Sequence, residues 1–176
     1  MKSEIAHKIK HRDIPNDKIS TPVEFAKKCI SFVPFEIGDL VLDPARGSGV
    51  FYNNFPDYIT KDWCEIDEGR EFMLYNQQVD WIVTNPPYSE LNDWLVKACQ
   101  ISRKGFAYLV HLHSITPKRL ELIESYGFGL TFIHLVKVFQ WFGMSAFVIF
   151  VRGKAGLISY DRIVWRGNSV ESDIEL

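Results

Sequence analysis

The apolar residues of this chain follow two spacings along the sequence. Short unbroken apolar runs are typical of strands buried on both faces, and apolar residues that recur every three or four positions are typical of helices. The predicted strands are residues 39–42, 61–67, 79–84, 105–110, 130–138, 145–151 and 157–165. Helices are predicted from 21 to before Pro34, over 91–101 and over 117–126. Strands that alternate with helices indicate an α/β fold with a doubly wound, mostly parallel sheet, and the closely spaced late strands indicate an antiparallel C-terminal edge.

The first helix has a clear start signal. Thr21 is expected to act as the N-cap, Pro22 to occupy the first helical position, and Glu24 to lie in the first turn. A further short helix could open after the glycine-bearing turn of residues 43–49.

Candidate chemistry follows the first predicted strand. Asp43-Pro44-Ala45-Arg46-Gly47-Ser48-Gly49 carries two glycines that allow close backbone approach. The turn has no Lys-Ser/Thr pair, so it is not a phosphate loop, and Asp43 suits a cationic ligand such as a sulfonium or an ammonium group. Glu65 ends the next predicted strand, where a carboxylate can accept from ribose hydroxyls. Taken alone, this composition is common at ordinary strand-turn-helix junctions.

The most informative segment is Asn85-Pro86-Pro87-Tyr88, which directly follows an apolar strand. Each proline fixes its own φ and lacks an N–H, so carbonyl oxygens stay available as acceptors. Asn85 adds an amide that donates and accepts, and Tyr88 adds a flat ring. The segment suits a planar group with an amino nitrogen, such as adenine, although Asn-Pro and Pro-Pro are also ordinary turn sequences.

Composition narrows the classes of protein. The 176 residues suggest a single domain, and the net charge of −2 gives no overall basic field. We expect a basic N-terminal segment at 1–18, one domain at 19–167 and an acidic tail at 168–176. Three widely spaced cysteines predict neither a disulfide framework nor a metal site. No apolar stretch is long enough for a membrane helix and no signal peptide is evident, so a cytoplasmic protein is expected.

Together, these motifs resemble class I S-adenosylmethionine-dependent methyltransferases that act on adenine N6 in DNA, whose fold is Rossmann-like. Residues 43–49 resemble that family's first motif, and residues 85–88 match its catalytic motif. The resemblance spans roughly residues 19–151. It implies S-adenosylmethionine as cofactor and S-adenosylhomocysteine as product. The cofactor-binding residues it implies are Thr21, Pro22, Asp43, Pro44, Ala45, Gly47, Gly49, Glu65, Ile66 and Asn85.

The chain departs from the family pattern between residues 67 and 80, where a helix and a strand are normally found. The segment is too short for both, so Glu71 and Phe72 are assigned to the cofactor adenine and the region is expected to be shortened. No target-recognition domain fits after residue 151. A minimal catalytic domain of this kind is typical of phage or mobile-element genomes, and a partner subunit or homodimer could supply target recognition.

The resemblance also implies a mechanism. Asn85 and the Pro86 carbonyl would accept the adenine amino N–H groups, and Tyr88 would stack on the flipped base. Phe139, Trp141 and Phe142 are candidates for the other face of the base, although aromatic residues near strand ends usually belong to the core. His111 and His113 could line the crevice. Lys118 and Arg119 form either a solvated helix face or a phosphate contact.

Alternatives remain at this level. The same catalytic motif serves methyltransferases of the glutamine amide in release factors, but those relatives lack the Asp43-Pro44 start and carry a helical N-terminal domain. Adenine in RNA is a second alternative. A third is a catalytically inactive methyltransferase-like subunit that binds nucleic acid.

Overall fold

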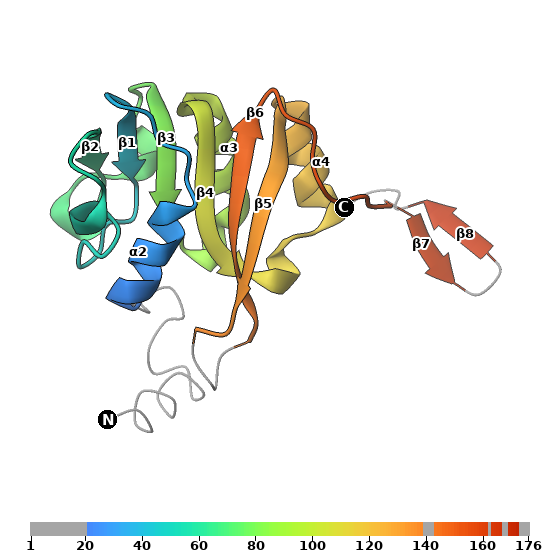
Figure 1. Ribbon diagram of the computed structural model, residues 1–176. Helices are drawn as coiled ribbons and strands as arrows, with labels where there is room; N and C mark the ends of the chain where they lie inside the picture. Colours follow the sequence, from blue (N-terminus) through green and yellow to red (C-terminus); the bar gives the residue numbers. More distant parts are fainter. Residues whose placement is uncertain (1–20, 139–142, 162, 167–168, 173–176) are drawn as a thin grey trace.

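A six-stranded sheet with the order β2-β1-β3-β4-β6-β5 forms the centre of the protein (Figure 1). The computed structural model describes residues 21–138, 143–161, 163–166 and 169–172. The strands of the six-stranded sheet are β1 Leu40–Asp43, β2 Thr60–Trp63, β3 Val79–Thr84, β4 Ser102–His111, β5 Phe128–Val136 and β6 Ser145–Arg152. The first four pair in parallel, and β6 is antiparallel to both β4 and β5. The predicted mostly parallel sheet with an antiparallel C-terminal edge is therefore confirmed.

Helices cover both faces of this sheet. Helices α3 (Leu91–Ile101) and α4 (Pro117–Ser125) lie on one face, and α2 (Val23–Ser31) lies on the other (Figure 1). The central strand β4 has a continuous apolar run instead of alternating polar and apolar residues, because both of its faces are buried. Phe106 and Tyr108 belong to the core beneath α3 and α4, whereas Ala107 and Leu109 belong to the core beneath α2. Because successive side chains of a strand point to opposite faces, burial of both faces requires a continuous apolar run.

The link from β2 to β3 is short, as the sequence predicted. Residues 64–78 contain only two turns of 3-10 helix, η3 (Ile66–Glu68) and η4 (Phe72–Leu74), and neither a strand nor an α-helix. Phe72 is 3% exposed and packs against Trp94 of α3, with ring centroids 4.7 Å apart. Its ring therefore fills part of the core on the α3 side of the sheet. The remaining 3-10 turns are η2 Tyr52–Asn54, η5 Tyr88–Glu90 and η6 Leu112–Ser114.

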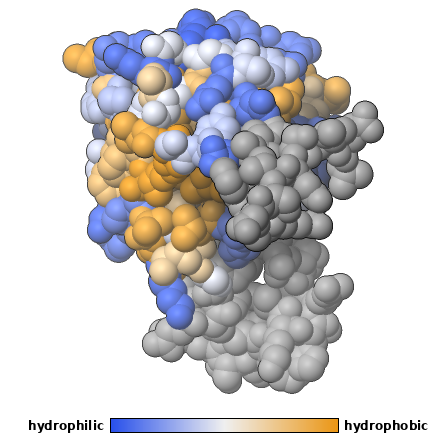
Figure 2. Space-filling model, turned by 90° about the vertical axis from the view of Figure 1, so that its right-hand side faces the viewer, coloured by the Kyte–Doolittle hydropathy of each residue, from blue (hydrophilic) through white to orange (hydrophobic). Residues whose placement is uncertain are grey.

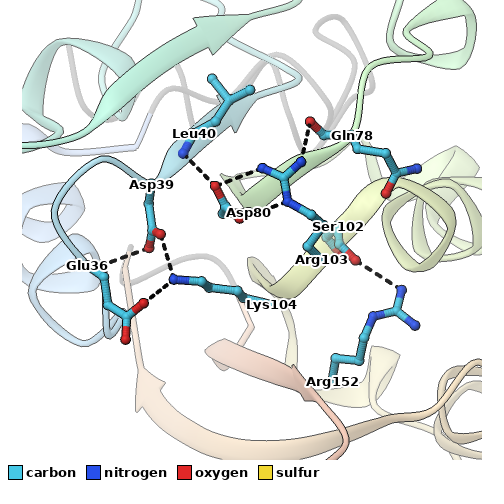
Figure 3. Close-up of polar contacts among 9 residues, drawn as sticks. All are labelled: Glu36, Asp39, Leu40, Gln78, Asp80, Ser102, Arg103, Lys104 and Arg152. Atoms are coloured by element: carbon cyan, nitrogen blue, oxygen red, sulfur yellow. Dashed lines mark hydrogen bonds and ion pairs between the residues drawn. The ribbon is translucent and has the colours of Figure 1, made fainter.

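Ion pairs join the amino ends of the strands (Figure 3). Asp80 at the start of β3 accepts from Arg103 Nε and Nη2, each at 2.9 Å, and from Leu40 N at 2.9 Å. Lys104 Nζ donates to Asp39 Oδ1 at 2.7 Å and also pairs with Glu36. These contacts fix the amino ends of β1, β3 and β4 relative to one another. The predicted site lies at the carboxyl ends of the strands, on the opposite side.

Three local predictions need correction. Helix α2 begins at Val23 with Pro22 as its N-cap, because the ψ of 137° at Pro22 is extended rather than helical, and the Thr21 side chain does not cap it. After the glycine turn there is only the 3-10 turn η2, not an α-helix. The last predicted strand, 157–165, is absent over 157–161: Leu157 N makes one bond to Leu130 O, and a strand, β7, begins only at Ile163.

The C-terminal part forms a hairpin that does not join the main sheet. Strands β7 (Ile163–Arg166) and β8 (Ser169–Ser172) pair only with each other (Figure 1). The domain boundary predicted at residue 167 lies between these two strands. Apolar residues gather on the face of the molecule seen in Figure 2, which is the right-hand side of Figure 1.

Candidate active site

The carboxylate of Asp43 joins the carboxyl ends of β1 and β3. Asp43 is 1% exposed and accepts hydrogen bonds from Thr84 Oγ1 at 2.8 Å, Tyr52 N at 3.2 Å and Ala45 N at 3.3 Å. Burial raises the pKa of Asp43 to about 7, against the opposing effect of these three donors. The side chain thus holds the glycine turn onto the neighbouring strand and onto η2.

The glycine turn has the shape its sequence requires. Gly47 and Gly49 have φ angles of 50° and 82°, which side-chain-bearing residues adopt only with strain. A Cβ at Gly49 would lie 2.6 Å from Asn53 Nδ2, whereas among the described residues a Cβ at Gly47 would meet only Ala45 O at 4.0 Å. The outer side of Gly47 is therefore open, and a ligand could approach its backbone closely.

Glu65 lies two residues beyond the end of β2, beside this turn. Its carboxylate accepts from Gly47 N at 2.6 Å and from Asp67 N at 3.2 Å. A carboxylate has about four acceptor positions, so two remain for a ligand beside these two bonds. Ile66, the next residue, is 70% exposed and offers an apolar surface at the same place.

The Asn-Pro-Pro-Tyr segment leaves β3 next to this turn. Tyr88 Oη donates to Asn85 Oδ1 at 3.0 Å, and Asn85 Nδ2 donates to Thr21 Oγ1 at 3.4 Å. Thr21 is 7% exposed and immediately precedes Pro22. The structure thus brings together the start of α2, the end of β3 and, through Thr84, the turn after β1.

Histidines from the end of β4 extend this group of residues. The His111 ring lies against the Tyr88 ring, with centroids 4.7 Å apart and planes at 51°. The His113 ring stacks on His111, with centroids 4.9 Å apart and planes at 23°. Burial, together with the charge of His113, lowers the pKa of His111 below its ordinary value of 6.5.

The other predicted site residues differ in their burial and in their contacts. Pro44 and Pro86 are buried, and Glu71 is exposed at the start of η4, next to Phe72 in the core. Arg119 donates to Asn92 Oδ1 at 2.8 Å and to Ser114 O at 2.9 Å, so it is anchored rather than freely solvated. The stacking candidates Phe139, Trp141 and Phe142, and the basic segment 1–18, lie outside the described residues.

Sequence reasoning missed the role of Thr84. Its hydroxyl bonds to Asp43 in the interior, although the two residues are far apart in sequence. The available signal was a polar residue that ends the otherwise apolar run 81–84.

Within the described ranges, no group of three or more His, Cys, Asp or Glu residues could hold a metal ion. The three cysteines are free and buried, and burial raises the thiol pKa of Cys64 to about 11 and of Cys29 and Cys99 to about 12. No helix among the described residues is long and apolar enough to cross a membrane.

Several solved structures have a fold similar to that of this chain. Similar structures include TrmN from Thermus thermophilus, with a TM-score of 0.58 and 18% identity over 77% of this chain and 50% of that one. The Mtq2–Trm112 complex of E. cuniculi gives 0.62 and 15% identity over 78% and 99%. Magnesium protoporphyrin IX methyltransferase from Synechocystis PCC 6803 gives 0.61 and 10% identity over 86% and 82%.

At these identities the likeness establishes the fold, which is that of class I S-adenosylmethionine-dependent methyltransferases. The chain spans half the length of TrmN. Neither a scan against protein-family models nor a search of curated proteins found a match.

Proposed function

We propose that this chain transfers a methyl group from S-adenosylmethionine to the N6 amino group of adenine in DNA. The observation that carries the proposal is the position of Asn85 at the carboxyl end of β3. Its amide is held from both sides by Thr21 and Tyr88, and it lies beside the glycine turn that Asp43 anchors. In doubly wound folds, ligands bind outside the carboxyl ends of the strands.

The residues present fit this cofactor. The open outer side of Gly47 leaves room for the methionine part, and Glu65 retains acceptor positions for ribose hydroxyls. Ile66 is exposed next to Glu65 and offers the cofactor an apolar contact. Asp43 fits differently from the direct ligand expected from the sequence: its carboxylate is buried within the turn, so we assign it the role of fixing the turn's shape.

The acceptors of the Asn85 segment would orient the target amino group. The bound cofactor supplies an electrophilic methyl group on a sulfonium. The lone pair of an exocyclic adenine nitrogen is delocalised into the ring, and N–H bonds to Asn85 Oδ1 and to the Pro86 carbonyl localise it. Positioning of this kind can supply up to about 7–11 kcal/mol of a reaction barrier in favourable cases.

Tyr88 supplies the stacking surface in this proposal. Its ring is half-buried and fixed between Asn85 and His111, so it offers a flat surface with little freedom to lose. Stacking of a base on an aromatic ring contributes about 1–3 kcal/mol, which offsets part of the cost of flipping a base out of a duplex.

The direct test is methyl transfer from labelled S-adenosylmethionine to DNA, with N6-methyladenine identified by mass spectrometry after digestion to nucleosides. Asn85→Ala is expected to lower the rate by about 100-fold or more, the scale seen when one hydrogen-bonding group of a reaction site is removed. Asn76→Ala is the matched control, because Asn76 is exposed and bonds only weakly to Lys97 at 3.4 Å. Equal rates for the two variants would contradict the proposal.

A second candidate is methylation of a protein glutamine amide. Its support is the similarity to the Mtq2–Trm112 complex, described as responsible for methylation of the eRF1 termination factor. A glutamine amide presents N–H groups much as adenine does, so the Asn85 acceptor suits both. Incorporation of label into a Gln-containing peptide but not into DNA would favour this candidate, whereas incorporation into RNA alone would favour adenine in RNA.

The proposal includes a partner subunit or a second copy of this chain that supplies target recognition. A catalytically inactive nucleic-acid-binding subunit is the alternative. Calorimetric titration of S-adenosylmethionine into the protein separates the two, because an inactive subunit without cofactor affinity would give no heat of binding.

A further inference from the structure

A continuous line of contacts runs along the carboxyl ends of the strands, from the end of β4 to the start of α2. It runs from His113 to His111 and Tyr88 through ring contacts, and from Tyr88 to Asn85 and Thr21 through hydrogen bonds. The catalytic role proposed above uses only the Tyr88 and Asn85 end of this line. The two histidines at its other end have no role in that proposal.

The backbone of His111 is firmly fixed. His111 pairs with Ser145 of β6 at the last position of the β4–β6 ladder, and Leu112 N donates to Met144 O at 2.9 Å directly after it. Gly143, two residues before β6, lies close to the imidazole, since a Cβ built on it would lie 3.9 Å from His111 Nδ1. Because the backbone of His111 is held in place, its ring forms a fixed contact with the Tyr88 ring.

We propose that neutral His111 is a positioning residue that holds the Tyr88 ring against the substrate, so that methyl transfer at this site is lost when His111 becomes protonated. The inference rests on the proposed methyltransferase function. It adds a regulation by pH that the catalytic motif itself does not contain.

The surroundings of His111 determine the sign of the effect. Among the described contacts of His111, the titratable groups are His113 of η6 and Tyr88 of η5, and the adjacent position of β6 is the uncharged Ser145. A second positive charge next to His113 would be repelled, and a half-buried imidazolium would lose part of its hydration. Because both effects lower the pKa of His111, the neutral stack is the form that the fold favours.

Protonation of His111 therefore drives its imidazole towards water, and the Tyr88 ring loses the support of this contact. Activity is expected to be full above the pKa of His111 and to fall as the pH drops through it. An uncharged ring at position 111 should support the Tyr88 ring at every pH. A side chain without a ring at this position should not support it at any pH.

The test is the pH profile of kcat/KM for DNA methylation in wild type, H111A and H111F. H111A is expected to lose about tenfold at neutral pH, as for one lost stacking contact. H111F should recover part of that loss and lack the acid decline of the wild type. H134Q is the control: His134 lies on the edge strand β5 and contacts Phe32, with ring centroids 4.9 Å apart, and the acid decline of this variant should match the wild type. An unchanged acid decline in H111F would overturn the proposal.

A second readout does not depend on methyl transfer. In an NMR titration, the Tyr88 ring resonances should shift with the same midpoint as the His111 imidazole, and H113Q should raise that midpoint. Tyr88 resonances that do not follow His111 would overturn the inference. If no DNA is methylated at any pH while the two rings titrate together, the proposed DNA substrate is wrong and the coupling of Tyr88 to His111 stands.

Discussion

Thr84 Oγ1 donates a hydrogen bond of 2.8 Å to Asp43 Oδ1 and so joins the carboxyl ends of β1 and β3 inside the protein. Thr84 is 0% exposed and Asp43 is 1% exposed. The carboxylate also accepts from two backbone N–H groups, those of Ala45 and Tyr52. One buried side chain therefore fixes both the glycine turn and its distance from the strand that carries Asn85.

Thr84→Val should destabilise the protein, because it removes one donor from a buried carboxyl group without changing the shape of the side chain. The expected loss is about 1–3 kcal/mol of unfolding free energy. Urea unfolding followed by circular dichroism would measure it. Thr131→Val is the control: its hydroxyl donates to Ile149 O at 3.2 Å in a partly buried position, and a smaller loss is expected.

Asp43 should make the protein less stable as the pH rises. Burial raises its pKa in the folded state from 3.8 to about 7, so between these values the folded state holds more protons than the unfolded state. The stability that Asp43 contributes is complete below the unfolded-state pKa and is lost as the pH rises through about 7.

The matching experiment is urea unfolding of wild type and Asp43→Asn over a series of pH values. The neutral amide cannot titrate, so the variant should lose the part of the pH slope that comes from this residue. Identical slopes in the two proteins would show that Asp43 is ionised in the folded state throughout the series.

Gly47→Ala should separate the shape of the turn from its proposed binding role. A non-glycine residue with positive φ costs about 1–2 kcal/mol. Gly127 has a φ of 81°, and no atom of the described residues lies within 4 Å of an added Cβ, so Gly127→Ala should carry a similar cost away from the turn. Only Gly47→Ala is expected to weaken S-adenosylmethionine binding in calorimetry. Equal affinities in the two variants would argue against cofactor binding at this turn.

Asp80 should have the opposite pH dependence from Asp43. The hydrogen bonds from Arg103 are the main cause that lowers the pKa of Asp80 in the folded state. Its contribution is therefore present above the unfolded value of 3.8 and is lost as the pH falls through the folded-state pKa.

Asp80→Asn should cost about 1–2 kcal/mol at neutral pH, since Arg103 is half exposed and its charge is partly screened. The difference from wild type should shrink in strong acid. Glu24→Gln breaks the exposed pair with Lys27 and should change the unfolding free energy by less than about 0.5 kcal/mol. A loss as small for Asp80→Asn would mean that the ion pairs of Figure 3 do not hold the strand starts together.

The sequence by itself predicted most of the strands and helices along the chain, although the short helix after the glycine turn and the extent of the last strand were wrong. Val79–Thr84 and Leu91–Ile101 have the predicted bounds, because an apolar run and a helical spacing are local signals that the final packing did not alter. It also placed the candidate chemistry at strand ends, since Asp43 and Asn85 each follow a buried strand. The shortened link after Glu65 was readable from length alone.

Only the tertiary structure decided which polar groups meet. The bond from Thr84 to Asp43 joins residues 41 positions apart, and that from Asn85 to Thr21 spans 64 positions. Such contacts depend on strand order, which no local pattern encodes. The same applies to Thr21, whose hydroxyl bonds to Asn85 and does not cap α2. Burial within the assembled sheet likewise brings the Asp43 carboxylate against Thr84, Ala45 and Tyr52, so that it fixes the shape of the turn.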